Sequence, residues 1–155
     1  MTRSTAAERF SLDTNVLVYA ADSLAGEKQA RALDLIARAA RSNCHLTLQA
    51  LSEFYAVVTR KDLMPKAEAA AQLRDWLDLF PTIAPTPAAL IVAAKAAETG
   101  AIAYWDALLL ASARDGGCTV LLSEDMQDGA KLLGVRIRNP FVGAALPATV
   151  ERTRL

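Results

Sequence analysis

Carboxylates are the side chains of this sequence that are best suited to chemistry. Asp13 directly follows a β-like run at 9–12, and Asp125 comes just after the strongly apolar run 119–123. In an open parallel sheet, ligands bind beyond the carboxyl ends of the strands, where loops from separate strands converge. Alone, each Asp is equally well explained as a cap or turn residue, because Asp readily caps the helix or turn after a strand.

Two further acids lie on predicted helices. Asp106 falls on the apolar stripe of the helix expected at 104–114, which directs a charge toward the core. The helix dipole also favours an Asp in the first turn, but that effect does not require the buried side. Glu53 lies at the border of the apolar arc of the helix expected at 49–60, where an ordinary surface glutamate would fit as well.

If the four acids converge, they require a cation. Two carboxylates ~4 Å apart repel by about 4 kcal/mol at an effective dielectric constant of about 20. A single histidine, His45, excludes schemes that need two histidines, and two cysteines are too few for the usual nitrogen and sulfur ligands of zinc. All-oxygen ligands select hard divalent ions, and Mg²⁺ binds substrate phosphates readily. The acids therefore indicate Mg²⁺ or Mn²⁺ and phosphoryl chemistry.

The elements that must position these acids alternate between strand and helix. The β-like runs are at 9–12, 44–48, 82–86, 119–123 and 135–138, helical spacing is found at 27–41, 49–60, 67–79, 87–99 and 104–114, and 15–21 fits either. The run 119–123 predicts a central parallel strand, and the alternation at 135–138 predicts an edge strand. The face predicted to be buried on 27–41 consists of Ala30, Leu33, Ile36, Ala37 and Ala40. Together the elements predict one α/β domain with three layers around a mostly parallel sheet.

Composition narrows the class of protein. The chain has 155 residues, 53% hydrophobic and 22% charged, which predicts a globular core. Lysine plus arginine and aspartate plus glutamate both number 17, so no global positive field attracts nucleic acid or an anionic membrane. A polyanion would have to be held locally, through metal ions. Because cysteines are few and no apolar run approaches the ~20 residues of a membrane span, we expect a cytoplasmic protein without membrane contact.

Four short segments, each centred on an acid, resemble those of the PIN-domain family, and in particular the small bacterial VapC-like toxins of type II toxin–antitoxin pairs. They are Leu-Asp-Thr-Asn-Val-Leu at 12–17, Leu-Ser-Glu-Phe at 51–54, Tyr-Trp-Asp-Ala at 104–107 and Leu-Leu-Ser-Glu-Asp-Met at 121–126. The likeness extends over nearly the whole chain. It implies a single three-layer α/β/α PIN-like domain over 1–155, with an N-terminal extension at 1–9 and a C-terminal tail at 141–155.

The resemblance also implies which residues act. The catalytic and metal-holding acids of the family fall on Asp13, Glu53, Asp106 and Asp125. Glu124 and Asp128 lie close enough in the sequence to replace or assist the fourth acid, Asp125. Asn15 and Ser123 match polar positions that orient the carboxylates.

The implied activity is that of an endoribonuclease that uses one or two Mg²⁺ or Mn²⁺ ions to hydrolyse RNA phosphodiester bonds. Without a pair of histidines, the metal must both activate a water molecule and stabilise the leaving oxygen. The candidates for contacts with RNA phosphates are Arg60, Lys61, Arg114, Lys131 and Arg136, each of which alone also fits a solvated surface. Members of the family form homodimers and are blocked by a cognate antitoxin, so we expect both partners.

Other functions fit part of the pattern. An aspartyl phosphatase of the haloacid dehalogenase type needs a second Asp two residues after the first, where this chain has Asn15. A catalytically inert PIN-like module would keep its acids and bind RNA or a protein partner without turnover. Trp105, beside Asp106, would either stack on a base or pack in the core or a dimer interface, and we expect packing.

Overall fold

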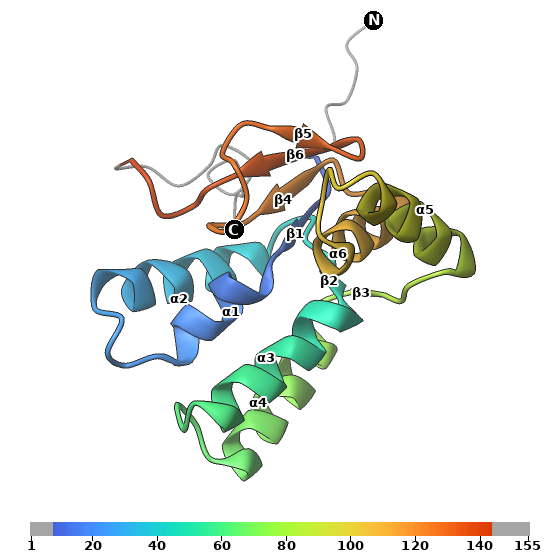
Figure 1. Cartoon of the computed structure of the whole chain (residues 1–155). Helices are drawn as coiled ribbons and strands as arrows, with labels where there is room; N and C mark the ends of the chain where they lie inside the picture. Colours follow the sequence, from blue (N-terminus) through green and yellow to red (C-terminus); the bar gives the residue numbers. More distant parts are fainter. Residues whose placement is uncertain (1–7, 144–155) are drawn as a thin grey trace, which may run out of the picture.

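The computed structural model describes residues 8–143 (Figure 1). Within this range, the helices and strands in chain order are β1 (Phe10–Leu12), α1 (Thr14–Ala21), α2 (Glu27–Ala39), β2 (Leu46–Thr47), α3 (Leu48–Arg60), α4 (Lys66–Leu79), β3 (Thr82–Ile83), α5 (Pro87–Glu98), α6 (Tyr104–Asp115), β4 (Val120–Leu122), β5 (Lys131–Leu132) and β6 (Val135–Arg138). None of the helices in the described part is both long and apolar enough to cross a bilayer. Most of the expected extension at 1–9 and tail at 141–155 lies outside the described residues.

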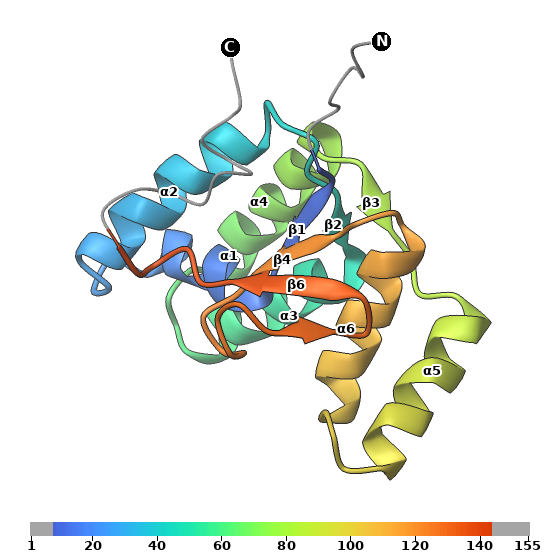
Figure 2. The ribbon, with the colours of Figure 1, turned by 90° about the horizontal axis from the view of Figure 1, so that it is seen from above.

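The main sheet lies between two groups of helices. In Figures 1 and 2, α1 and α2 lie on one side of the sheet, and α5 and α6 lie on the other. The four strands of this sheet follow the order β1-β4-β6-β5, and β2 pairs with β3 in a small second sheet. A bridge between Phe10 and Cys44 joins the start of β1 to the segment before β2. The architecture is the three-layer α/β/α arrangement that the sequence predicted.

Strand β4 is the centre of the main sheet. It pairs in parallel with β1 on one side and with β6 on the other. Every residue of β1 and β4 is buried, and Leu121 and Leu122 are fully inaccessible. An apolar run covered on both faces is typical of a central parallel strand. The prediction for 119–123 is thus confirmed, and the ends of β1 and β4 lie side by side.

The edge strand, in contrast, was predicted wrongly. β6 lies between β4 and β5, and the edge is the two-residue strand β5, which the sequence did not predict. The turn between β5 and β6 consists of Leu133 and Gly134, both with positive φ, as in the two-residue hairpins that match strand twist. Leu-Gly is not a usual sequence for such a turn. The alternation in β6 instead reflects one buried face, formed by Val135 and Ile137.

The buried face of α2 is rotated by about one residue from the prediction. Its buried residues are Ala32, Leu35, Ile36 and Ala39. Leu33, which was expected in the core, is 52% exposed. Alanines occur on both candidate stripes, so helical periodicity alone does not distinguish them. Packing of α2 against α1 decides which leucine is buried.

Candidate active site

Asp13 is held in place at the junction of β1 and α1. Its backbone N–H donates to the carbonyl oxygen of Leu122 over 2.9 Å, which fixes it beside the end of β4. Its Oδ1 accepts from the N–H of Thr14 at 2.7 Å, so Asp13 caps α1, and the ambiguous segment 15–21 is helical. Its Oδ2 accepts from Ser123 Oγ at 2.7 Å. Asp13 is only 7% exposed, and it therefore combines a capping role with a buried carboxylate at the site.

Asn15 and Ser123 join α1 to the loop after β4. Asn15 Nδ2 donates to Asp13 Oδ2 over 3.4 Å and to Ser123 Oγ over 3.3 Å. Asn15 Oδ1 accepts from the N–H of Glu124 at 3.3 Å, and Ser123 Oγ accepts from the N–H of Asp125 at 3.2 Å. These contacts are those expected of side chains that orient neighbouring carboxylates.

Glu53 reaches the site from α3, which Thr47 caps through the N–H of Ala50. Its Oε2 accepts from Thr14 Oγ1 at 2.8 Å, and its Oε1 accepts from Gln49 Nε2 at 3.1 Å. Sequence reasoning missed both donors. The spacing of Gln49 and Glu53 was the available signal, because residues four apart on a helix are neighbours.

The four predicted acids line one cavity of about 430 Å³, here called the acidic pocket. Asp13 and Asp125 come from the ends of adjacent strands, Glu53 from α3, and Asp106 from the first turn of α6. Asp22, a fifth acid that the sequence analysis did not single out, also lines it, and its Oδ1 accepts from the N–H of Leu24. The fold thus brings acids from distant parts of the sequence into one pocket.

Burial, and to a smaller extent charge repulsion, raises the pKa values of Asp13 and Asp106 in this pocket. Burial raises the pKa of Asp13 from 3.8 to about 6, against the opposing hydrogen bonds from Ser123 and Thr14, and the charges of Asp125 and Asp106 add to the rise. Burial also raises the pKa of Asp106, together with the charges of Asp125 and Glu53. Among the described residues, Lys61 is the one basic side chain that lines the pocket. The field in the pocket is therefore negative and weakly compensated.

The acids are gathered in one pocket without forming a closed ligand cage. Within residues 8–143, no three His, Cys, Asp or Glu side chains are close enough to form a ready-made metal site. In the same range, the carboxylates of Asp106 and Asp125 form no hydrogen bond or ion pair. Their oxygens are consequently available to a ligand.

Glu124 and Asp128 have other partners. Lys28 Nζ lies 2.7 Å from Glu124 Oε2, and the Tyr19 hydroxyl donates to Glu124 Oε1 over 2.5 Å. Burial alone would raise the pKa of Glu124, but the hydrogen bonds from Lys28 and Tyr19 outweigh it and lower the pKa. Asp128 Oδ1 accepts from the N–H of Asn139 at 2.9 Å. Neither acid lines the acidic pocket.

Only one of the five candidate phosphate-binding side chains lines the acidic pocket, namely Lys61, just after α3. Arg60 is the exposed last residue of α3. Arg114 Nη1 donates to the carbonyl oxygen of Leu133, and Arg136 Nη1 donates to that of Gly129 over 2.7 Å. Lys131 is exposed on β5. The last three therefore belong to the end of α6 and to the β5–β6 hairpin.

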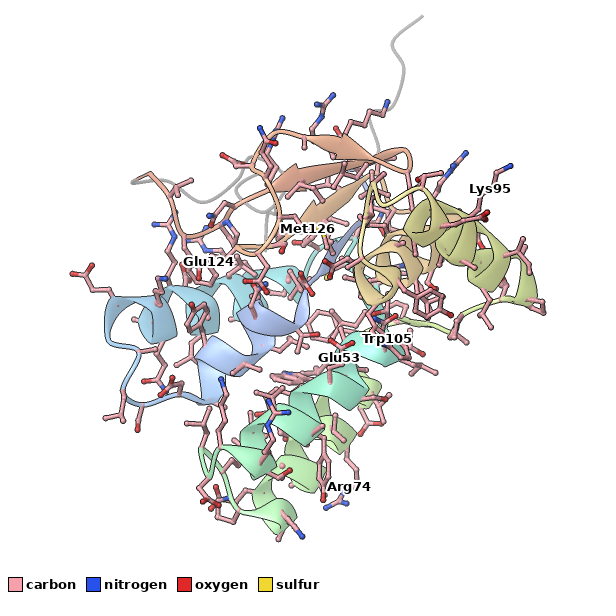
Figure 3. All side chains as sticks on the ribbon, viewed as in Figure 1. Glu53, Arg74, Lys95, Trp105, Glu124 and Met126 are labelled. Carbon is pink, nitrogen blue, oxygen red and sulfur yellow. The ribbon has the colours of Figure 1, made fainter. Side chains whose placement is uncertain are left out.

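A second cavity, of about 570 Å³ and mostly apolar, shares Glu53 with the acidic pocket. We call it the apolar pocket; Leu48, Gln49, Ser52, Glu53, Ala56, Pro85, Trp105 and Leu108 line it. Figure 3 shows Glu53 on α3 close to Trp105 at the start of α6. Trp105 is 63% exposed, so it is not part of the core of this chain.

Comparisons with known proteins agree with the fold described above. The fold is similar to that of a chain in the crystal structure of VapBC2 from Rickettsia felis bound to a promoter DNA fragment, with a TM-score of 0.61, 16% identity, and coverage of 84% of this chain and 98% of that chain. The fold is also similar to that of a chain of DNA-bound VapBC from Salmonella typhimurium, with a TM-score of 0.58, 16% identity, and coverage of 84% of this chain and 97% of that chain. A third similar structure is VapC20 of Mycobacterium tuberculosis, a toxin that cleaves the sarcin-ricin loop. Its TM-score is 0.54 and its identity 18%, with coverage of 75% of this chain and 91% of that chain. A search of curated proteins finds no match.

A family model, described as the PIN domain, matches residues 11–127, which is more than half of the chain. The matched range includes all four acids that line the acidic pocket. Because the model spans both the fold and these acids, the chain belongs to the PIN-domain family.

Proposed function

We propose that this chain is a metal-dependent endoribonuclease and the toxin of a type II toxin–antitoxin pair. The observation that carries the proposal is the acidic pocket, in which four acids from distant parts of the chain share a negative, weakly compensated field. Membership of the PIN-domain family supports nuclease chemistry. Similar folds occur in VapBC complexes and in VapC20, which cleaves the sarcin-ricin loop. The substrate is RNA, and the protein works as one cytoplasmic domain over 1–155.

The chemistry of the donor set fits Mg²⁺ or Mn²⁺. All donors are carboxylate oxygens, which these ions prefer. Asp13, Asp106 and Asp125 would hold the ion, with Glu53 binding it directly or through water. A divalent charge would also offset the burial and the smaller charge repulsion that raise the pKa values of Asp13 and Asp106.

The residues of the chain orient the reaction. When bound, the ion supplies an activated water molecule and positive charge for the leaving oxygen. Ser123 and the N–H of Thr14 hold the Asp13 carboxylate in one orientation, because each donates to a different oxygen. Lys61 supplies a positive charge at the pocket wall, where a phosphate of the RNA would lie.

We propose Asp125 as the fourth acid, in preference to Glu124 and Asp128. Asp125 lines the acidic pocket, and its carboxylate has no competing hydrogen bond within the described range. Glu124 is neutralised by Lys28, and a carboxylate that is already paired is a poorer ligand. Asp128 is engaged by the backbone of Asn139.

We also propose a homodimer and an antitoxin as protein partners. α5 exposes Leu90, Ile91 and Val92, and Ile91 is 71% exposed. Apolar side chains that are adjacent on an exposed helix are typical of an interface. A second copy covering α5 would remove them from water, and the antitoxin would bind elsewhere on each subunit.

RNA cleavage by substituted proteins tests the nuclease. We expect Asp13→Asn and Asp106→Asn to lose Mn²⁺-dependent cleavage of RNA while remaining folded, since Asn matches the size of Asp but lacks its charge. Asp34→Asn is the matched control, because Asp34 pairs with Arg38 on the exposed side of α2. Full activity in both site variants would overturn the mechanism. A parent protein that binds Mn²⁺ and RNA without cutting would instead identify an inert PIN-like module.

A further inference from the structure

A chain of hydrogen bonds connects the backbone segments that carry three of the acids. Thr14, directly after Asp13, donates through Oγ1 to Glu53 Oε2 over 2.8 Å. Gln49 Nε2 donates to Glu53 Oε1 over 3.1 Å and to the carbonyl oxygen of Trp105 over 2.9 Å. Trp105 directly precedes Asp106. These hydrogen bonds thus connect α1 through α3 to the first turn of α6.

Gln49 is the link between Glu53 and α6, and chemistry dictates its orientation. Both of its partners, a carboxylate oxygen and a carbonyl oxygen, are acceptors only. The amide nitrogen must face them, because a flipped amide would direct its oxygen at two acceptors and lose both hydrogen bonds. With both N–H groups engaged, Gln49 cannot rotate without breaking a contact.

This orientation leaves the other end of the amide unsatisfied. Gln49 Oε1 is buried and has no hydrogen-bond partner among the described residues. A buried acceptor without a partner lowers stability. The charge-assisted bond to Glu53 and the bond to α6 must therefore outweigh that cost. The two hydrogen bonds that Gln49 donates are thus kept although its amide oxygen has no partner among the described residues.

Gln49 and Thr14 donate to different oxygens of the Glu53 carboxylate, Gln49 to Oε1 and Thr14 to Oε2. Each oxygen of the Glu53 carboxylate receives one donor, so the plane of the carboxylate is held from two sides. Each oxygen still has a lone pair free, and Glu53 lines the acidic pocket. The two donors therefore orient Glu53 without removing it from use as a ligand.

We propose that Gln49 is a positioning residue that orients Glu53 and sets its position relative to Asp106. The inference rests on the proposed function for its effect on metal binding. It applies to the metal-free protein as well, since both hydrogen bonds of Gln49 join atoms of the protein itself. Loss of a side chain that orients a metal-binding carboxylate typically weakens metal binding 10–100-fold.

Gln49→Leu tests the proposal, because leucine keeps most of the side-chain volume and removes both N–H donors. We expect the dissociation constant for Mn²⁺, measured by isothermal titration calorimetry without RNA, to rise about tenfold or more. Gln29→Leu is the matched control: Gln29 Nε2 donates to the carbonyl oxygen of Ala20 over 3.2 Å and so also links two helices, and neither residue lines the acidic pocket. We expect that variant to bind Mn²⁺ like the parent. Equal Mn²⁺ affinities in the two folded variants would overturn the proposal.

A double-mutant cycle separates positioning from a general loss of structure. If Gln49 acts through Glu53, Gln49→Leu has a much smaller effect on Mn²⁺ affinity when Glu53→Gln is already present. A purely structural role would give the same effect in both backgrounds. Additive effects across the cycle would therefore contradict the proposal.

A readout without metal keeps this inference distinct from the proposed function. In ¹⁵N-labelled, metal-free protein, we expect Gln49→Leu to shift the backbone amide resonances of Asp106 and Ala107 at the start of α6, and Gln29→Leu to leave them in place. Shifts confined to α3 would overturn the role of Gln49. A parent protein that binds no Mn²⁺ would overturn the metal-dependent function, and the amide shifts alone would then decide the role of Gln49.

Discussion

The hydroxyl of Ser123 donates to Oδ2 of Asp13 over 2.7 Å, although 110 residues separate them in the chain. Ser123 directly follows β4 and Asp13 directly follows β1, and these two strands pair in parallel. The hydrogen bond therefore forms at the carboxyl ends of two neighbouring strands, where parallel sheets bring their loops together. It places a neutral donor against the most buried of the four acids.

Removing this donor is expected to destabilise the protein. Ser123→Ala leaves a buried, ionised Asp13 with one donor fewer, and we expect the free energy of unfolding at pH 7.5 in EDTA to fall by about 1–3 kcal/mol. Ser112→Ala is the control, because the Ser112 hydroxyl is buried and has no hydrogen-bond partner within residues 8–143, so its loss is expected to be neutral or stabilising. Urea unfolding measures both. A Ser123→Ala protein as stable as the parent would contradict the importance of this contact.

Stability without metal is expected to fall as the pH rises from about 4 to about 6. The pKa of Asp13 is raised from 3.8 to about 6, so the native state binds this proton more tightly than the unfolded state does. The stabilisation is complete below the unfolded pKa and is lost as the pH rises through the folded pKa. Asp13→Asn removes the ionisable group. We expect its free energy of unfolding to be about 1–3 kcal/mol higher than that of the parent at pH 7.5 and nearly equal to it at pH 4. A constant difference across this range would show that Asp13 has an ordinary pKa.

The identity of the fourth acid can be tested by two conservative substitutions in adjacent residues. We expect Asp125→Asn to weaken Mn²⁺ binding at least about tenfold. Glu124→Gln should change it less than about fivefold, because Glu124 is paired with Lys28 and does not line the acidic pocket. Isothermal titration calorimetry measures both affinities. The reverse order of effects would assign the ligand to Glu124.

We expect substitution of Lys61 to weaken RNA binding and substitution of Arg136 to lower stability. Lys61→Gln should weaken RNA binding and reduce the slope of log affinity against log salt by about 0.7, as expected for one lost contact to a single-stranded phosphate backbone. Arg136→Gln should leave RNA binding unchanged and lower the free energy of unfolding by about 1 kcal/mol, because its guanidinium donates to Gly129. Fluorescence anisotropy over a range of salt concentrations, together with urea unfolding, distinguishes the two roles. Loss of RNA affinity in the arginine variant would show that the β5–β6 hairpin contacts RNA.

The proposed homodimer predicts a response to charge on α5. Ile91→Lys would place a charge in the middle of the exposed apolar face, and we expect it to shift the protein to monomers in analytical ultracentrifugation. Leu24→Lys provides the control, since Leu24 is 91% exposed and lies between α1 and α2. A dimer that survives Ile91→Lys would exclude α5 from the interface.

Local patterns along the sequence determined the fold class and the acids. Strand and helix periods alternate within short windows. The apolar residues Val120, Leu121 and Leu122 within the run 119–123 predicted β4 as a central strand, and both of its faces are buried. Asp13 was recognised by its place after a strand, and Asp106 by its position on an apolar helical stripe. These signals depend on neighbours a few residues away, which is why they are visible in the sequence.

Tertiary packing decided the rest. Leu33 and Leu35 both fit a helical stripe, and the packing of α2, mainly against α1, determines that Leu35 is the one that is buried. Three acids follow β4 within six residues, and the direction of each side chain depends on distant partners, such as Lys28 for Glu124. The contacts of Thr14 and Gln49 with Glu53 likewise arise from how α1, α3 and α6 meet. Hydrogen bonds between separate elements leave no periodic trace in the sequence, because their geometry exists only once the elements have packed together.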